Sequence, residues 1–170
     1  LLTVVFDMVI AITAGILLAT MLFMKDIAAM TKVTDISSNR KQVDHNLPEG
    51  WKVLKISGPL FFAAADRIFA EVALLSQQQR GLVLYMDGVP LLDAGGLAAL
   101  DKLLHNCRKH NVELLVADLQ FQPLKTLAKA GIQPEPGQLT FYSTLREALE
   151  QLSGRQAEQE TVDASLLPVI

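Results

Sequence analysis

The residues of this chain that could carry out chemistry are few and far apart. Asp87 and Asp93 lie six positions apart around a loop, where they could act as paired carboxylates. A strand-end aspartate followed by a helix-capping aspartate is the simpler interpretation. The single cysteine, Cys107, shows no metal-ligand spacing with the three histidines. The chain also lacks the glycine motifs that cradle nucleotide phosphates. The sequence therefore predicts no catalytic set, no metal site and no cofactor.

The segment most suited to binding is a short loop before a predicted helix, Asp93-Ala94-Gly95-Gly96. Asp93 is placed to cap the helix, because its carboxylate can accept hydrogen bonds from free backbone N–H groups of the first turn. The two glycines would leave the backbone of that turn open to an anion or to the backbone of a partner. A tight helix start is the simpler meaning of the glycine pair. We treat all four residues as a candidate partner-binding surface.

Basic side chains are grouped on the exposed face of the same predicted helix. Lys102, His105 and Lys109 have the spacing of one helix face, and Arg108 lies beside them. The chain as a whole carries a net charge of −3, so this basic stripe stands out. A solvated helix face explains such a stripe, and docking to an acidic protein or to anionic headgroups is the alternative. We add these four residues to the candidate partner-binding surface.

An alternation of strands and helices must position these residues. Apolar or alternating runs predict four strands, and amphipathic spacing predicts four helices. Pro123 and Gly131 mark the ends of the third helix, and a Thr144–Glu147 capping box begins the last. The expected strands cover residues 51–56, 82–86, 112–117 and 139–142, and the expected helices residues 66–77, 97–107, 123–131 and 144–154. This order predicts a small α/β domain with a largely parallel sheet and packed helices.

Residues 1–24 are apolar apart from Asp7. As a helix, residues 8–24 would extend roughly 25 Å, close to the hydrocarbon thickness of a bilayer. A secretory signal would begin with a basic segment, whereas the first lysine here, Lys25, follows the apolar run. A buried core helix is the alternative, but the run is long for a soluble core. We therefore predict a transmembrane helix, with Asp7 as the N-cap of its membrane part or as an intramembrane ion site.

The sequence divides into four expected parts. These are a transmembrane helix over residues 1–30, a connector over 31–42, an α/β domain over 43–153 and a flexible tail over 154–170. Four basic residues follow the apolar run, which by the positive-inside rule places the domain in the cytoplasm; they are Lys25, Lys32, Arg40 and Lys41. The chain begins with leucine, so we expect it to be the C-terminal part of a larger protein. Its acidic net charge argues against nucleic-acid binding.

Two segments resemble a known family. Residues 87–97 join a buried strand to a helix through an Asp-x-x-Gly loop, as in STAS domains, which are named after sulfate transporters and anti-sigma factor antagonists. Residues 58–66 read GPLFFAAAD and resemble the G-x-L-F-F-x-x-A-D pattern of the transporter branch. The similarity covers about residues 43–152. With the preceding apolar helix, the sequence resembles the C-terminal part of SulP anion permeases, and among them the bacterial C4-dicarboxylic acid transporters.

The resemblance implies a STAS-type α/β fold that follows, in the chain, the last membrane helix of a secondary anion transporter in the bacterial inner membrane. That transporter would be a symporter of dicarboxylate or sulfate type. The domain would do no chemistry and would regulate the transporter or dock partners. Its implied partners are the remainder of the transporter membrane domain, membrane lipid and a second copy of the chain in a homodimer. An acidic cytosolic protein, such as acyl carrier protein, would fit the loop and the basic stripe together.

Two other functions compete with this interpretation. A binding module like the anti-sigma factor antagonists would have no apolar helix. It would carry two serines in the loop, the second of which is phosphorylated in that branch. This chain has Ala94 and Gly95 at those positions, and neither has a hydroxyl group. A small membrane-attached α/β enzyme would need a convergent nucleophile and base, which the sequence does not contain.

Overall fold

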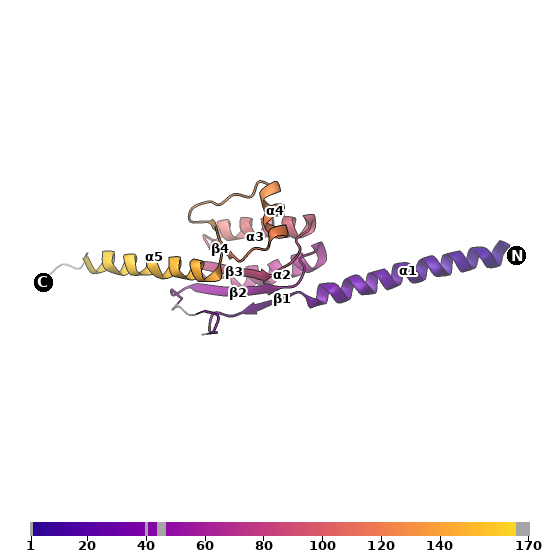
Figure 1. Cartoon of the computed structure of the whole chain (residues 1–170), viewed down its shortest axis with the longest axis horizontal. Helices are drawn as coiled ribbons and strands as arrows, with labels where there is room; N and C mark the ends of the chain where they lie inside the picture. Colours follow the sequence, from indigo (N-terminus) through magenta and orange to yellow (C-terminus); the bar gives the residue numbers. More distant parts are fainter. Residues whose placement is uncertain (1, 40, 44–46, 166–170) are drawn as a thin grey trace.

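The structure is a computed structural model that describes residues 2–39, 41–43 and 47–165. A five-stranded sheet lies at its centre, and the helices α1 and α5 project from opposite ends of the domain (Figure 1). The strands are β1 (Lys32–Asp35), β2 (Trp51–Ser57), β3 (Gly81–Gly88), β4 (Glu113–Ala117) and β5 (Leu139–Tyr142). The helices are α1 (Leu2–Met30), α2 (Phe62–Leu75), α3 (Ala94–Lys109), α4 (Phe121–Lys129) and α5 (Leu145–Ser165).

The strands lie in the sheet in the order of the chain. β2, β3, β4 and β5 pair successively in parallel, whereas β1 pairs antiparallel with β2 at the edge. Connections between parallel neighbours are right-handed almost without exception, so this order places the connecting helices on one face. Accordingly, α2, α3 and α4 share one face of the sheet, and α5 covers the other. The predicted α/β fold with a largely parallel sheet is confirmed.

Alternation along the strands divides the buried side chains between two layers. Leu84 and Val116 point into the larger apolar cluster, beneath α2, α3 and α4. Their neighbours Val83 and Leu115 point into the smaller cluster, beneath α5. Successive side chains of a strand face opposite sides of a sheet, so the continuous apolar runs of β3 and β4 serve both layers.

The expected connector over residues 31–42 contains a strand of the sheet. Lys32–Asp35 forms β1 and pairs with the last four residues of β2. Ile36, directly after the strand, is buried in the cluster beneath α5. Three of the four side chains of β1 are exposed, so its sequence lacks the apolar alternation that marks a strand. Backbone pairing at the edge of the sheet holds the strand instead.

The last helix continues past the predicted stop at Gly154 and ends at Ser165. A glycine inside a helix costs only about 0.5–1 kcal/mol, which need not end the helix. Arg155 Nη1 lies 2.8 Å from Glu113 Oε1, so the helix is tied to the start of β4 beyond that glycine. This hydrogen bond also raises the pKa of Arg155. Residues 154–165, expected to be a flexible tail, are therefore helical, and residues 166–170 lie outside the described residues.

The boundaries of α4 differ in part from the prediction. The helix begins at Phe121, so Pro123 is its third residue rather than its first. A proline is tolerated there because the first N–H groups of a helix have no partner within it. Gly131 ends the helix as predicted, with a φ of 74° and with its N–H donating to the carbonyl of Ala128.

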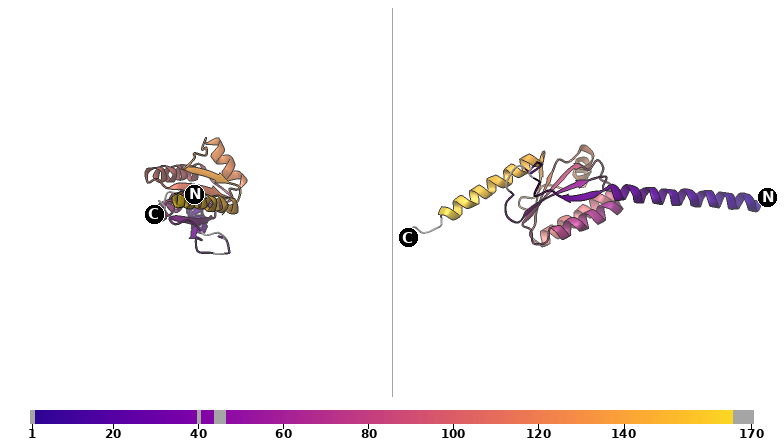
Figure 2. Two further views of the ribbon diagram at one scale, coloured as in Figure 1. Left: turned by 90° about the vertical axis from the view of Figure 1, so that its left-hand side faces the viewer. Right: turned by 90° about the horizontal axis from the view of Figure 1, so that it is seen from below.

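α1 is one continuous helix of 29 residues. Its side chains at positions 4–26 are exposed, and Figure 2 shows α1 extending away from the sheet. By length and composition it can cross a membrane. Asp7 lies inside the helix, so the expectation that it caps a helix starting at Met8 is wrong. The alternative role of Asp7, as an intramembrane ion site, stays a prediction.

Candidate functional site

The loop identified in the sequence lies at the end of the sheet from which α1 emerges. Lys32, two residues after α1, pairs with Ser57 at the end of β2. Ser57 pairs in turn with Gly88 at the end of β3, and Tyr85 of β3 pairs with Ala117 at the end of β4. The carboxyl ends of β2, β3 and β4 therefore lie at the same end of the sheet as the C-terminus of α1. This is the end of the strands at which α/β sheets generally bind ligands. We call the loops there, residues 58–61, 89–93 and 118–120, the α1 edge.

Asp93 caps α3 as predicted, because its Oδ1 accepts a hydrogen bond of 2.6 Å from the N–H of Gly96. Gly96 is buried, and a Cβ at this position would lie 2.7 Å from Leu92 Cδ1 and would also collide with the backbone of the loop before α2. Gly96 therefore permits close backbone packing, which supports the tight helix start. Of the other two loop residues, Ala94 is exposed and Gly95 is half-buried.

The loops of the α1 edge are bonded to one another. Leu60, before α2, donates its N–H to the carbonyl of Leu91, before α3, at 2.9 Å. The Gln122 side chain of α4 accepts from the N–H of Leu92 at 2.9 Å and donates to its carbonyl at 3.1 Å. A glutamine amide thus replaces a backbone partner for a loop residue. The sequence analysis missed this role, because a surface glutamine carries no local signal of its partner.

Two residues of the basic stripe form ion pairs within the domain. Lys102 Nζ lies 3.3 Å from Asp66 Oδ1 on α2. Arg108 Nη2 lies 2.6 Å from Glu135 Oε1, in the segment between α4 and β5. Both pairs are largely exposed to solvent, so each stabilises the fold by at most about 1 kcal/mol and can yield to a partner.

The stripe and the loop do not form one compact surface. α3 begins at the α1 edge and runs away from it, so Lys109 lies about 21 Å along the helix from Gly95. Lys102 is nearer, at about 10 Å from Gly95 along the helix. His105 and Lys109 are exposed toward the far end of α3. A single small partner would therefore contact either the loop with Lys102 or the far part of the stripe.

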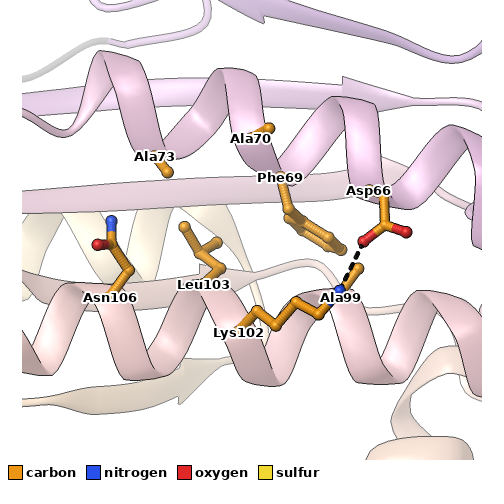
Figure 3. Close-up of a pocket in the computed structure, with 8 residues that line it drawn as sticks. All are labelled: Asp66, Phe69, Ala70, Ala73, Ala99, Lys102, Leu103 and Asn106. Atoms are coloured by element: carbon orange, nitrogen blue, oxygen red, sulfur yellow. Dashed lines mark hydrogen bonds and ion pairs between the residues drawn. The ribbon is translucent and has the colours of Figure 1, made fainter.

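A groove of about 200 Å³ lies between α2 and α3 and includes Lys102. Figure 3 shows the Lys102–Asp66 ion pair at one end of this groove and Asn106 at the other. The groove is open where alanine side chains are too short to fill the gap between the two helices. The remaining lining is apolar and consists of Phe69, Ala70, Ala73, Ala99 and Leu103. The groove could receive an apolar side chain whose neighbour carries a negative charge.

The junction between α1 and the domain is a single buried residue, Thr31. Its Oγ1 donates to the carbonyl of Pro59 at 2.8 Å. Gly58 has a φ of 107° and packs so closely that a Cβ there would lie 2.8 Å from Thr31 Cα. Arg67 of α2 donates from Nη2 to the carbonyls of Thr31, at 2.9 Å, and of Ala28, at 3.1 Å. Arg67 thus satisfies a carbonyl at the end of α1, where helices leave such groups unpaired.

An ion cluster lies on the α5 face of the sheet, at the carboxyl ends of β2 and β3. Lys55 Nζ is 3.1 Å from Asp87 Oδ1 and 3.2 Å from Asp87 Oδ2. Only the contact with Oδ2 has the geometry of a hydrogen bond, and Oδ1 has no hydrogen-bond partner among the described residues. The same ammonium lies 4.8 Å from the centroid of the Tyr85 ring. Burial, and then a hydrogen bond to Asp87, raise the pKa of Tyr85 to about 12. Asp87 and Asp93 are thus an ion-pair partner and a helix cap.

Cys107 is buried in the core, and burial raises the pKa of its thiol to about 11. At neutral pH it is a packed thiol and not a thiolate nucleophile. In the part of the chain that the structure describes, no three histidine, cysteine, aspartate or glutamate residues could together hold a metal ion.

Gly96→Ala should lower the free energy of unfolding by about 1–3 kcal/mol, because the added methyl group has no room at the start of α3. Gly154→Ala is the matched control. Gly154 also lies in a helix, but no atom beyond the adjacent helix backbone lies within 4 Å of its Cβ position, so alanine should stabilise the chain by up to about 1 kcal/mol. Urea unfolding of the full chain in detergent micelles measures both. Equal effects of the two substitutions would contradict the packing role of Gly96.

Comparison with known proteins relates these features to a family. A model of the STAS domain family matches residues 41–148. A curated protein of Bacillus subtilis (strain 168), named "Putative sulfate transporter YvdB", is 30% identical over 144 residues, which are 83% of this chain and 27% of that protein. The chain thus spans about a quarter of the length of this curated relative.

Solved structures share the fold. The crystal structure of a sulfate transporter family protein from Wolinella succinogenes is 25% identical, with a TM-score of 0.56 over 71% of this chain and 96% of that chain. The murine Slc26a9 anion transporter in its inward-facing state has a TM-score of 0.67 at 16% identity, over 84% of this chain and 25% of that chain. The anti-sigma factor antagonist SpoIIAA reaches a TM-score of 0.50 at 14% identity, over 63% of this chain and 91% of that chain.

The last two similarities concern the fold alone, whereas the family match is one of sequence. It covers more than half of the chain, from before β2 into α5, and includes the Asp93 loop, the groove and the ion cluster. The chain therefore belongs to the STAS domain family.

Proposed function

We propose that this chain is the last membrane helix and the cytoplasmic STAS domain of a SulP-type secondary anion transporter. The junction at Thr31 carries the proposal, because a helix that can cross a membrane continues without a linker into the STAS fold. The curated relative is named as a sulfate transporter, and Slc26a9 is an anion transporter. The remainder of the transporter membrane domain would precede α1 in the chain.

The proposed orientation places the STAS domain in the cytoplasm and α1 in a bacterial inner membrane. Lys25 lies near the end of α1, and Lys32, Arg40 and Lys41 follow within a few residues. Basic residues flanking a membrane helix are retained on the cytoplasmic side. The acidic net charge of the chain makes this local basic excess more distinct.

The proposed role of the domain is binding and assembly rather than catalysis. Gly58 and Asp66, the ends of the transporter-type segment GPLFFAAAD, support this role. Gly58 packs on Thr31, and Asp66 pairs with Lys102 at the groove. Anti-sigma factor antagonists share the fold and are the second candidate. Their phosphorylation switch needs a hydroxyl group in the loop, which Ala94 and Gly95 do not have.

The proposed transported anion is a C4-dicarboxylate, taken up by symport with a cation. This choice follows the resemblance of the sequence as a whole to the bacterial C4-dicarboxylic acid transporters among the SulP permeases. Cells that express the full-length transporter should accumulate labelled succinate, and collapse of the cation gradient should abolish uptake. An excess of unlabelled sulfate should leave succinate uptake unchanged, and cells without the gene provide the background. Uptake of sulfate without uptake of succinate would contradict the assignment.

The proposed cytosolic partner is an acidic protein, such as acyl carrier protein, that docks across the groove between α2 and α3. Lys102 offers a positive charge at one end of an apolar groove, and its exposed ion pair with Asp66 is weak enough to exchange. A second copy of the chain is the other proposed occupant. Charge complementarity of this kind chiefly affects association rate and its dependence on salt.

Lys102→Glu should slow the association of acyl carrier protein with the full chain in detergent micelles and should reduce its salt dependence. Arg146→Glu is the matched control, because Arg146 is exposed on α5, on the other face of the sheet. Surface plasmon resonance at low and high salt measures both rates, and size-exclusion chromatography reports dimerisation. No binding to the unsubstituted chain, or equal losses in the two variants, would remove acyl carrier protein from the proposal.

A further inference from the structure

Apolar side chains are exposed at the α1 edge, near the end of the membrane helix. On α4, Phe121 is 79% exposed and Leu124 is 49% exposed. In and directly after the loop before α3, Pro90 and Ala94 are exposed and Leu91 is half-buried. We call these five residues the apolar edge patch. Groups of exposed apolar side chains mark sites that contact a protein or a membrane.

The two parts of the patch lie on neighbouring segments, because α4 is bonded to the loop before α3. The side-chain amide of Gln122 forms hydrogen bonds with both the N–H and the carbonyl of Leu92. Gln120 donates to the carbonyl of Asp87, at the end of β3. These hydrogen bonds pair the backbone groups of Leu92 and the carbonyl of Asp87 with side chains at the start of α4. The exposed Phe121 and Leu124 therefore sit on a fixed surface.

The α1 edge lies at the depth of the lipid headgroups if α1 spans the bilayer. The span from Val4 to Met30 has 27 residues and measures about 40 Å, whereas the hydrocarbon core is about 30 Å thick. We assign the surplus to the C-terminal end of α1, where Lys25 and Asp26 are charged, so the last turns lie among headgroups. Arg67, in the first turns of α2, bonds to the carbonyl of Ala28, so α2 begins beside those last turns (Figure 1). The loops of the α1 edge lie at the same end of the sheet.

The charges of α4 complement an anionic membrane surface. Lys125 Nζ lies 5.8 Å from the centroid of the Phe121 ring, and Lys129 lies in the last turn of the helix. Both lysines are exposed. An exposed aromatic and aliphatic pair flanked by lysines is typical of helices that lie in the membrane interface. Anionic headgroups attract such lysines, although the chain as a whole is acidic.

We propose that the apolar edge patch inserts into the headgroup region of the bilayer that α1 spans, with Lys125 and Lys129 on anionic phospholipid headgroups. The proposal rests on the proposed function, because it requires α1 to cross that bilayer. Depth, exposed aromatic surface and local positive charge together favour lipid as the occupant. α4 thus gives the STAS domain a second membrane contact, which sets its tilt relative to the membrane.

Contact quenching of tryptophan fluorescence by brominated lipid tests the proposal. The full chain is reconstituted into vesicles of phosphatidylcholine and phosphatidylglycerol, with or without dibrominated acyl chains. Trp51 is the single native tryptophan. It pairs with Gly81 at the start of β2 and β3, at the end of the strands away from the α1 edge, so brominated lipid should not quench the emission of the unsubstituted chain. Phe121→Trp should add emission that brominated lipid removes. The double substitution Lys125→Glu and Lys129→Glu should weaken that loss, and an unchanged loss would overturn the role of the lysines.

Two further variants separate this proposal from the proposed function. Ile16→Trp, in the middle of α1, should be quenched more strongly than Phe121→Trp, and no quenching there would contradict the membrane span itself. Leu74→Trp is the matched control, because Leu74 is 67% exposed at the far end of α2. If Ile16→Trp is quenched and Phe121→Trp behaves like Leu74→Trp, the lipid contact is wrong. Unquenched but blue-shifted emission from Phe121→Trp would assign the patch to a protein partner and would also overturn the proposal.

Discussion

The close packing of Thr31 against Gly58 is the contact on which the arrangement of the molecule depends. Thr31 is the only residue between α1 and β1, so whatever fixes it fixes the direction in which the helix leaves the domain. It is fully buried, and its hydroxyl group and carbonyl are both hydrogen-bonded, to Pro59 and Arg67. A buried polar residue with its partners in place is stable, whereas one without them would cost several kcal/mol. The junction therefore has little freedom to act as a flexible linker.

This junction makes α2 the element that relates the membrane helix to the rest of the domain. Arg67 of α2 holds the end of α1, and the preceding residue, Asp66, pairs with Lys102 of α3 at the groove. The two neighbouring side chains connect α1 with the candidate partner site through one turn of helix. A partner that displaces Asp66 from Lys102 would act next to the residue that clamps α1. The candidate partner site and the residue that holds the end of α1 are thus adjacent in the chain, which agrees with the proposed docking role.

Local patterns in the sequence predicted much of the fold. Two caps were predicted correctly because each acts within a few positions: Asp93 caps α3, and Thr144 Oγ1 accepts from the N–H of Glu147. β1 was missed because its side chains are mostly exposed, and Gly154 was misread because a contact far along the chain, to Glu113, holds the helix beyond it.

The site was less accessible from the sequence. Helical spacing correctly placed the basic stripe on α3, but Asp66 and Glu135, which pair with its members, lie 36 and 27 residues away. The junction joins Thr31 to Pro59 and Arg67 across similar separations. Only Gly58 gave a signal there, as part of the transporter-type segment.

We infer that α1 and the STAS domain move as one rigid body joined at Thr31. Electron–electron double resonance tests it directly, with spin labels at Leu17→Cys on α1 and Leu74→Cys on α2, both exposed positions, while the buried Cys107 is replaced by alanine. In lipid nanodiscs the two labels should give one narrow distance distribution. Gly58→Ala, which forces a Cβ against Thr31, should broaden that distribution. A broad distribution with an intact junction, or a narrow one that Gly58→Ala leaves unchanged, would contradict the account.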